Sequence, residues 1–477
     1  MRKLLLILGC IITATSINAQ YNTNGLYNNH FTFDKAAFIP SKLGDNNARF
    51  EMRILPNTYL YAGNTFMSID DILYPTTSRI NEIVDDASDA NRIGVGTEAP
   101  WFAFSYKIKS NDKELLTVGL TSKARAFSNT SLGGNMLRLL WRGNKQFAGQ
   151  TVDLGKFELN AFAATEIGLT LAVPFKIGNT NIRGGASFKY LMAYGGIDLP
   201  QATSTITTGV DGRYVNMDLN YEINLANFDS DEGLPGKGIA FDLGATVNVG
   251  ESMQVSASVL DIGSINYSKN TTSYQFTGDM NFEGIEMDNL FENNSLKIDS
   301  AFIEQFKVNK DSGQAFSIAL PTRLVVQVEK HIGGTTKKGQ DYIKHSMYLT
   351  YIQGFNNSAG GTTNPYASLG YAYSLKELIN IGPTVNYGGY SGLGAGMFLS
   401  VKAGPFRMGV GSNSIFSYFL FPKSARGIDA SFTTAWVFGK QKEKGFEEFK
   451  DFKAPEEIDT SKRKSKKELK KAIETKE

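Results

Sequence analysis

The sequence predicts an all-β protein, a transmembrane antiparallel β-barrel of about 14 strands, with about 16 as the alternative count. Two observations lead to this prediction: long stretches in which apolar and polar residues alternate, and a secretory start followed by no apolar run of the roughly 20 residues that a membrane helix needs. A tilted strand that crosses a bilayer takes roughly 9 to 11 residues, with one face toward lipid and the other toward a polar lumen.

The clearest alternation covers residues 237–250 and exceeds the about 5 to 6 residues of an ordinary strand. Its two faces are Ile239, Phe241, Leu243, Ala245, Val247 and Val249 against Asp242, Gly244, Thr246 and Asn248. The same pattern returns in residues 182–192, 253–259, 393–401 and 428–438. A secreted β-sandwich array shares the alternation, but its units of ~100 residues are normally separated by linkers, and the sequence shows no repeat of that period. The barrel is therefore the favoured fold.

The N-terminus has the layout of a secretory signal peptide over residues 1–19. A basic start (Arg2, Lys3) precedes an apolar run, and the small residue Ala19 marks the cleavage position, which predicts Sec-dependent export to the outer membrane. A lipidation signal ending at Cys10 is disfavoured, because the apolar run before that cysteine is short. Cys10 is the chain's one cysteine, so the exported protein has none and must close its fold without disulfides.

Residues 20–47 form a polar and aromatic N-terminal segment before the barrel, which we assign to residues 48–439. Its composition is compatible with two structures, a plug that fills the lumen or a disordered leader. The first strand candidate of the barrel is interrupted at Pro56. A loop over residues 68–100 carries five aspartates, but their spacing matches no known cation-binding loop, and the sequence predicts no metal site.

Residues 266–312 are the longest departure from the strand pattern and predict an insertion with helical pieces. Phe302, Ile303 and Phe306 lie one and four residues apart and form one apolar stripe. The sequence leaves open whether that stripe folds into the lumen, caps one mouth or docks on a partner chain.

Residues 440–477 predict a charged periplasmic tail with 13 Lys or Arg and 10 Asp or Glu. This tail is either solvated or a contact for an envelope protein partner. The rest of the chain then holds 36 basic residues (49 minus 13) and 37 acidic residues (47 minus 10), so no basic surplus points to nucleic acid.

Four stretches together resemble a known family: residues 258–265, 318–324, 404–415 and 425–439. They are similar to an uncharacterised family of Bacteroidetes outer-membrane barrels, classified as a domain of unknown function. In architecture that family resembles the long-chain fatty-acid transporter (FadL/TodX-like) barrels and the barrel subunits of the type IX secretion apparatus. The resemblance implies an outer-membrane barrel and gives no ligand-binding residue.

The residues of these stretches have structural interpretations. We expect Asp261 and Gly263 to end a strand at a turn, Pro321 to lie where a ladder hydrogen bond can be spared, and Asn413 to occupy a turn or left-handed position. The strand that closes the barrel carries the aromatic residues Phe432, Trp436 and Phe438.

Catalytic constellations are absent from the sequence. The three histidines, His30, His331 and His345, show no metal-ligand spacing, and residues 389–393 fail the Gly-x-Ser-x-Gly pattern at their last position. We expect no enzyme, no cofactor and no metal. The resemblance instead implies a FadL-like channel for hydrophobic or amphipathic small molecules in contact with outer-membrane lipid. The alternative is a non-transporting scaffold or accessory subunit of an envelope machine, such as type IX secretion or outer-membrane protein assembly.

Overall fold

The computed structural model describes residues 23–46, 48–110, 113–178, 180–211, 214–229, 231, 233–250, 252–282, 307–335 and 341–439. Three predictions lie outside the described residues: the signal peptide with its cleavage near Ala19, the apolar stripe of Phe302, Ile303 and Phe306, and the charged tail 440–477.

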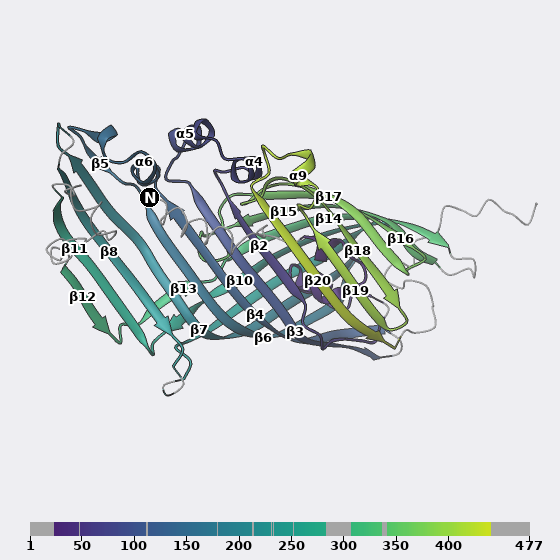
Figure 1. Ribbon diagram of the computed structural model, residues 1–477. Coiled ribbons are helices and arrows are strands. Elements are labelled where there is room, and N and C mark those ends of the chain that lie inside the picture. The colour runs from purple at the N-terminus through teal and green to yellow at the C-terminus, as the bar shows by residue number, and fades with distance from the viewer. Residues whose placement is uncertain are drawn as a thin grey trace, which may run out of the picture.

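Fourteen antiparallel strand positions close into one barrel, as the sequence predicts (Figure 1). The wall strands, in ring order, are β1 (Phe50–Arg53) with β2 (Thr58–Asn64), β3 (Arg92–Ser110), β4 (Lys113–Leu132), β6 (Phe157–Ile177), β7 (Thr180–Thr208), β9 (Gly236–Val249), β10 (Met253–Tyr267), β14 (Arg323–Thr335), β15 (Asp341–Gly354), β16 (Tyr366–Leu375), β17 (Ile379–Gly388), β18 (Gly392–Ala403), β19 (Phe406–Ser412) and β20 (Gly427–Phe438). Strands β1 and β2 share one position, because both pair with β3 and β20. Their pairing with β20 closes the ring and leaves the wall without an edge.

The break between β1 and β2 falls where the sequence places Pro56. A proline has no N–H to donate to a ladder, so it interrupts a strand. Asn57 bridges the break from inside: its amide nitrogen lies 2.8 Å from the Thr433 hydroxyl, and its amide oxygen accepts from the Thr434 N–H at 2.9 Å. The wall therefore stays connected across the interruption.

The wall is apolar outside and polar inside. In β9 the side chains of Ile239, Phe241 and Leu243 are 52%, 46% and 56% exposed, whereas Asp242 and Thr246 are 2% and 4% exposed. This is the reverse of a soluble protein and matches the pattern of a barrel surrounded by lipid.

The two ends of the barrel differ. One end has only short connections, such as 110–113, 177–180 and 403–406. The other end carries long loops with the helical elements α4 (Ile69–Leu73), α5 (Thr77–Asp85), α6 (Gly134–Arg142), η2 (Lys145–Phe147) and α9 (Ser417–Leu420). Figure 1 shows α4, α5, α6 and α9 along this same rim. None of the helices described is both long and apolar enough to cross a membrane.

The sheet forks at β7, and here one prediction is corrected. β7 pairs with β9 through residues 182–193 and with β8 (Val215–Asn227) through residues 195–208. β8 continues into a ribbon with β11 (Thr271–Phe282) and β12 (Lys307–Ser312), while β5 (Thr151–Asp153) pairs with the upper end of β7 and β13 (Phe316–Ala319) with β10. The supposed insertion 266–312 is therefore strand at both of its described ends. β11 alternates like a wall strand, with Tyr274, Phe276, Met280 and Phe282 on one face and Ser273, Gln275, Asp279 and Asn281 on the other. The sequence therefore carries a strand signal here that the insertion prediction overlooks.

Residues 23–46, which we term the inner segment, lie inside the barrel. They contain α2 (Asn24–Tyr27), α3 (Thr32–Ala36) and η1 (Pro40–Lys42). The side chains of Leu26, Tyr27, Phe31 and Ile39 are fully buried. Tyr27 hydrogen-bonds Ser368 of β16, and the Ser41 hydroxyl lies 2.8 Å from that of Thr246 in β9.

A glycine in β7 allows the inner segment to touch the wall backbone. A Cβ atom at Gly185 would lie 2.2 Å from the backbone nitrogen of Ser41, closer than any side chain can approach. Only a residue without a side chain leaves room for η1 at this position.

We predict that Gly185→Ala destabilises the barrel by about 1–3 kcal/mol, because the added methyl group overpacks the contact with η1. The measurement is the urea midpoint of unfolding in detergent micelles. Gly195→Ala is the matched control on the same strand, since its Cβ would meet its nearest atom, the Ala226 carbonyl oxygen, at an ordinary 3.4 Å. Equal midpoints for the two variants would contradict the placement of η1.

Candidate functional site

Asp261 lies inside a wall strand and does not end one. The sequence predicts a strand-ending turn at Asp261 and Gly263, but β10 continues through both residues. The pairing with β9 shifts register between Val259 and Ile262, which is a β-bulge, and Asp261 has a left-handed φ of 56°. Turns and bulges both favour Asp and Gly at unusual backbone angles, so the residues alone do not distinguish them. The turn prediction is therefore wrong.

The bulge directs the Asp261 carboxylate into a set of cations in the lumen. Arg125 of β4 donates to both carboxylate oxygens at 3.0 Å. The Lys189 ammonium of β7 lies 2.8 Å from one oxygen, and the Arg323 guanidinium of β14 lies 3.2 Å from the other. The Asp261 side chain is 1% exposed. One carboxylate thus connects four wall strands.

Further charged side chains complete what we term the charge cluster. Arg125 also lies 2.7 Å from Glu166 and 3.1 Å from Glu98, and Lys189 lies 2.7 Å from Asp242. The cluster consists of Lys123, Arg125, Lys189 and Arg323 with Glu98, Glu166, Asp242 and Asp261. Four positive and four negative groups balance. Charges buried in a low dielectric must be paired in this way, because an unpaired one carries a large desolvation penalty.

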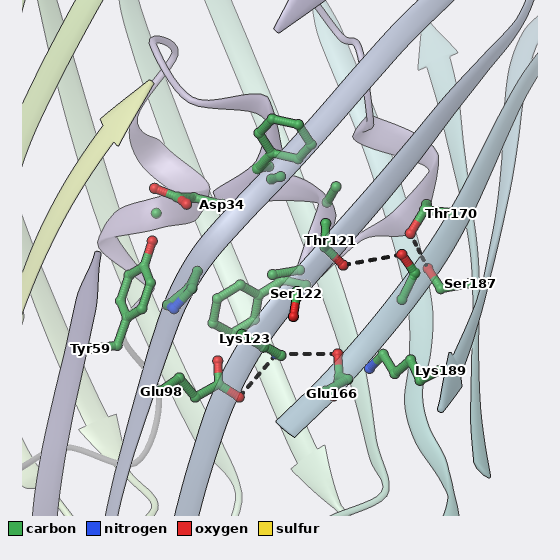
Figure 2. A pocket seen from close by; sticks show the side chains of 18 of the residues that line it. Asp34, Tyr59, Glu98, Thr121, Ser122, Lys123, Glu166, Thr170, Ser187 and Lys189 are labelled. Atoms are coloured by element: carbon green, nitrogen blue, oxygen red, sulfur yellow. Dashed lines mark hydrogen bonds and ion pairs between the residues drawn. The ribbon is translucent and has the colours of Figure 1, made fainter. Parts of the chain in front are cut away.

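A small cavity of about 130 Å³ lies between the inner segment and the charge cluster (Figure 2). The inner segment contributes apolar side chains to its lining, namely Phe33, Ala36, Phe38 and Leu43. Lysines 123 and 189 and their acidic partners line it from the wall, and Figure 2 shows Lys123 between Glu98 and Glu166. An apolar cavity of about 150 Å³ holds a molecule of benzene size. The space therefore suits one small amphipathic molecule or a few waters.

Ion pairs and charged hydrogen bonds fix the inner segment to the wall. The Arg53 guanidinium of β1 lies 2.6 Å from the Asp34 carboxylate, with both side chains 3% exposed. Lys42 pairs with Glu329 of β14. Arginines 183 and 407 donate to the backbone carbonyls of Leu43 and His30, at 2.6 and 2.7 Å. These contacts reach β1, β7, β14 and β19, so the inner segment is held around the circumference.

The remaining family-motif residues occupy separate places. A Cβ at Gly263 would lie 2.0 Å from the Ile239 carbonyl oxygen, so this glycine permits close approach of β9 and β10. Pro321 lies in the break between β13 and β14. Asn413 follows β19 without a left-handed φ. It accepts a hydrogen bond from the Thr23 hydroxyl at 3.2 Å and so contacts the inner segment.

The closing strand carries its aromatic residues at the seam with its neighbours. Phe438 of β20 stacks on Phe50 of β1 with ring centroids 5.0 Å apart. Trp436 lies against Phe406 of β19 at 4.9 Å, and Phe432 is 37% exposed on the outside.

Sequence reasoning missed the cations of the site. Lys123 and Arg125 lie two residues apart on β4 and therefore share a face, and both point inward. Two cationic residues at alternate positions within a strand pattern, on either side of Ala124, were the available signal. Among the residues described, no group of three or more His, Cys, Asp or Glu is arranged to hold a metal ion.

Comparison with known proteins identifies a family. A family model described as "Family of unknown function (DUF5723)" matches residues 37–413. No curated protein matches the sequence.

Solved structures give distant likenesses. The CymD monoaromatic hydrocarbon channel is 9% identical, with 90% of this chain and 99% of that chain covered and a TM-score of 0.42. The P. putida toluene transporter TodX is 7% identical over 85% and 94%, with a TM-score of 0.43. A Pseudomonas aeruginosa FadL homologue is 9% identical over 85% and 94%, with a TM-score of 0.39. The fold assignment rests on the strand pairings, and these likenesses add no argument about function.

We predict that Arg125→Met destabilises the barrel by about 3–5 kcal/mol, because it leaves buried carboxylates without their shared cation. Urea unfolding in micelles measures the change. The control is Arg142→Met in α6 at the long-loop end, whose pair with Asp85 is 31% and 60% exposed. It should change the stability little, because solvent screens an exposed pair. Equal losses of unfolding free energy in the two variants would show that the charge cluster contributes no more to stability than a surface ion pair.

Proposed function

We propose a function from the chain's own geometry, because the chain belongs to DUF5723, a family of unknown function. In this proposal it is an outer-membrane barrel that passes hydrophobic or amphipathic small molecules through its lumen when the inner segment moves. This retains the FadL-like channel implied by the sequence resemblance.

The outward faces of the strands support the membrane location. A closed wall with an apolar exterior satisfies every backbone group in lipid. In such barrels the short turns face the periplasm and the long loops face outward. This orientation places both β1 and the end of β20 at the periplasmic side, and we propose that the signal peptide is removed near Ala19 and that residues 440–477 extend into the periplasm.

The cavity is the observation that carries the transport proposal. The inner segment lines it with apolar side chains and with Asp34, which pairs with Arg53. The wall adds apolar side chains, such as Phe102 and Phe127, and charged side chains that are paired and sum to zero. A balanced lining does not select an ion of one sign, whereas polar and apolar flanks together favour an amphipathic solute. Because the space is only about 130 Å³, passage requires the inner segment to shift.

The test ties the inner segment to the wall with a disulfide, which the cysteine-free exported chain allows. Ser41→Cys with Thr246→Cys replaces two hydroxyls that are 2.8 Å apart and joins η1 to β9. In proteoliposomes, oxidation should reduce phenylalanine uptake about tenfold, and reduction should restore it. Entry of sucrose into the same proteoliposomes is the control for leakage.

The control disulfide shares the Thr246→Cys change but joins two wall strands and does not link the inner segment to the wall. Thr246→Cys with Ser256→Cys replaces hydroxyls that are 2.9 Å apart in the already paired strands β9 and β10. Its oxidation should leave uptake unchanged. Uptake that persists with the first disulfide formed would contradict gating by the inner segment. No uptake by the unmodified protein would contradict transport itself.

A second candidate function is a non-transporting scaffold or accessory subunit of an envelope machine. The buried contacts of Asp34 and Lys42 favour it, because an inner segment held this firmly also suits a barrel that never opens. The type IX secretion apparatus, implied by the resemblance to Bacteroidetes barrels, and outer-membrane protein assembly are two such machines. The partner would bind through the tail 440–477.

This second candidate predicts that an envelope protein co-purifies with the full chain in mild detergent and is lost when residues 441–477 are removed. Mass spectrometry of the eluted proteins measures the ratio of the envelope protein to the barrel. The truncated barrel should keep its unfolding midpoint, since the wall ends at β20. Purification of the full chain alone would exclude a stable scaffold role.

A further inference from the structure

The loop between β19 and β20 exposes a cluster of large apolar side chains at the rim. Ile415, Phe416, Phe419 and Leu420, which we term the α9 patch, are 53%, 38%, 84% and 59% exposed. We propose that the α9 patch is a lipid anchor that inserts into the adjoining membrane leaflet, with Lys423 contacting the phosphate of anionic lipid head groups. This anchor is independent of what the lumen transports.

Backbone contacts place α9 beside the wall. β19 ends at Ser412, opposite Met397 of β18. Beyond that point the Phe416 N–H donates to the Ala395 carbonyl at 2.9 Å, and the Ala395 N–H donates to the Ser417 hydroxyl at 2.9 Å. The segment around α9 therefore takes the position beside β18 that β19 leaves.

The loop covers the outer side of β18. Ser400 points into the lumen, where its hydroxyl lies 2.8 Å from His30 of the inner segment. Ala395 is five residues away and so belongs to the opposite, outward face together with Val401, which is 40% exposed. Ala395 itself is only 4% exposed although it lies on this face, and α9 is in contact with β18. The α9 patch thus lies on the lipid side of the rim.

The polar residues of the same loop turn the other way. The Asn413 N–H and the Ser414 hydroxyl both donate to the Asp429 carboxylate, at 2.7 and 2.8 Å, and both residues are buried. Polar groups therefore face the lumen and apolar groups face outward, as in the wall strands below.

The α9 patch continues the apolar exterior of the barrel. Val410 of β19 and Phe432 of β20 are 50% and 37% exposed on the outer face beneath it, and Tyr387 near the end of β17 is 69% exposed. A protein partner would have to cover an area that adjoins lipid on its lower side. This continuity favours a lipid occupant over a protein.

Basic residues flank the patch. Lys423 and Arg426 are exposed, and the Arg426 guanidinium donates to the Thr65 carbonyl at 2.5 Å. Aromatic side chains with lysine or arginine beside them are typical of the membrane interface, where the rings lie at head-group level and the cations reach the phosphates. Lys423 lies three residues after Leu420, the last residue of the patch, is exposed, and is therefore the cation we assign to this contact.

The experiment measures depth in the bilayer. The full chain carrying Phe419→Cys is labelled with a nitroxide and folded into phosphatidylcholine vesicles containing phosphatidylglycerol. Power-saturation spectroscopy compares the label's accessibility to oxygen, which concentrates in lipid, and to a water-soluble nickel chelate. Val210→Cys is the aqueous control, 87% exposed at the turn after β7, and Leu243→Cys, 56% exposed in β9, is the lipid control.

The oxygen-to-nickel ratio at position 419 should exceed that at position 210 at least about threefold and approach that at position 243. A ratio equal to that of Val210→Cys would overturn the anchor and point to a protein-docking surface instead. In the Phe419→Cys protein, omitting phosphatidylglycerol should move the label toward water, and adding Lys423→Ala should abolish this lipid dependence. A depth that is the same in both vesicles would overturn the role of Lys423.

Discussion

A wall of fourteen strands encloses more space than its own inward side chains can fill. The rest of this structure depends on how that space is filled. Closure is imposed by lipid, where no backbone group can stay unpaired. Small barrels of about 8 strands fill their interior with side chains alone, whereas larger ones need a plug or water. Here the inner segment, which precedes β1 in the chain, buries its apolar residues against the wall. Its polar and charged residues meet the polar interior.

A polar interior cut off from water sets a second requirement, that its charges be paired. The Asp261 bulge meets it by presenting one carboxylate to cations from β4, β7 and β14. The same arrangement leaves the cavity with a charged flank and places the apolar side of α3 opposite. The architecture and the candidate site therefore have one cause, the need to fill and neutralise the lumen. Because these contacts are many and buried, any movement of the inner segment must exchange them for others.

The sequence was sufficient for the wall and insufficient for what fills it. Residues 237–250 revealed a wall strand because lipid imposes strict alternation on one face, and β9 has that alternation. The ribbon strand β11 shows the same alternation from Tyr274 to Phe282 but lies outside the ring, so alternation indicates a strand without placing it in the wall. Asp261 was recognised as a special residue, but a turn and a bulge use the same residue types. The partners of Asp261 come from strands far apart in the chain, and only the ring order brings Arg125 and Lys189 to it. Asn413 likewise contacts Thr23 across almost the whole chain.

The most direct test of this account is the reactivity of a cysteine at Ser41 toward a membrane-impermeant maleimide in native outer-membrane fragments. Ser41 of η1 is fully buried against β9. If the inner segment fills the lumen, Ser41→Cys should react about a hundredfold more slowly than Val210→Cys and become reactive only on unfolding. Reaction at the rate of Val210→Cys would show that residues 23–46 form a free leader, and the account of the lumen would be wrong.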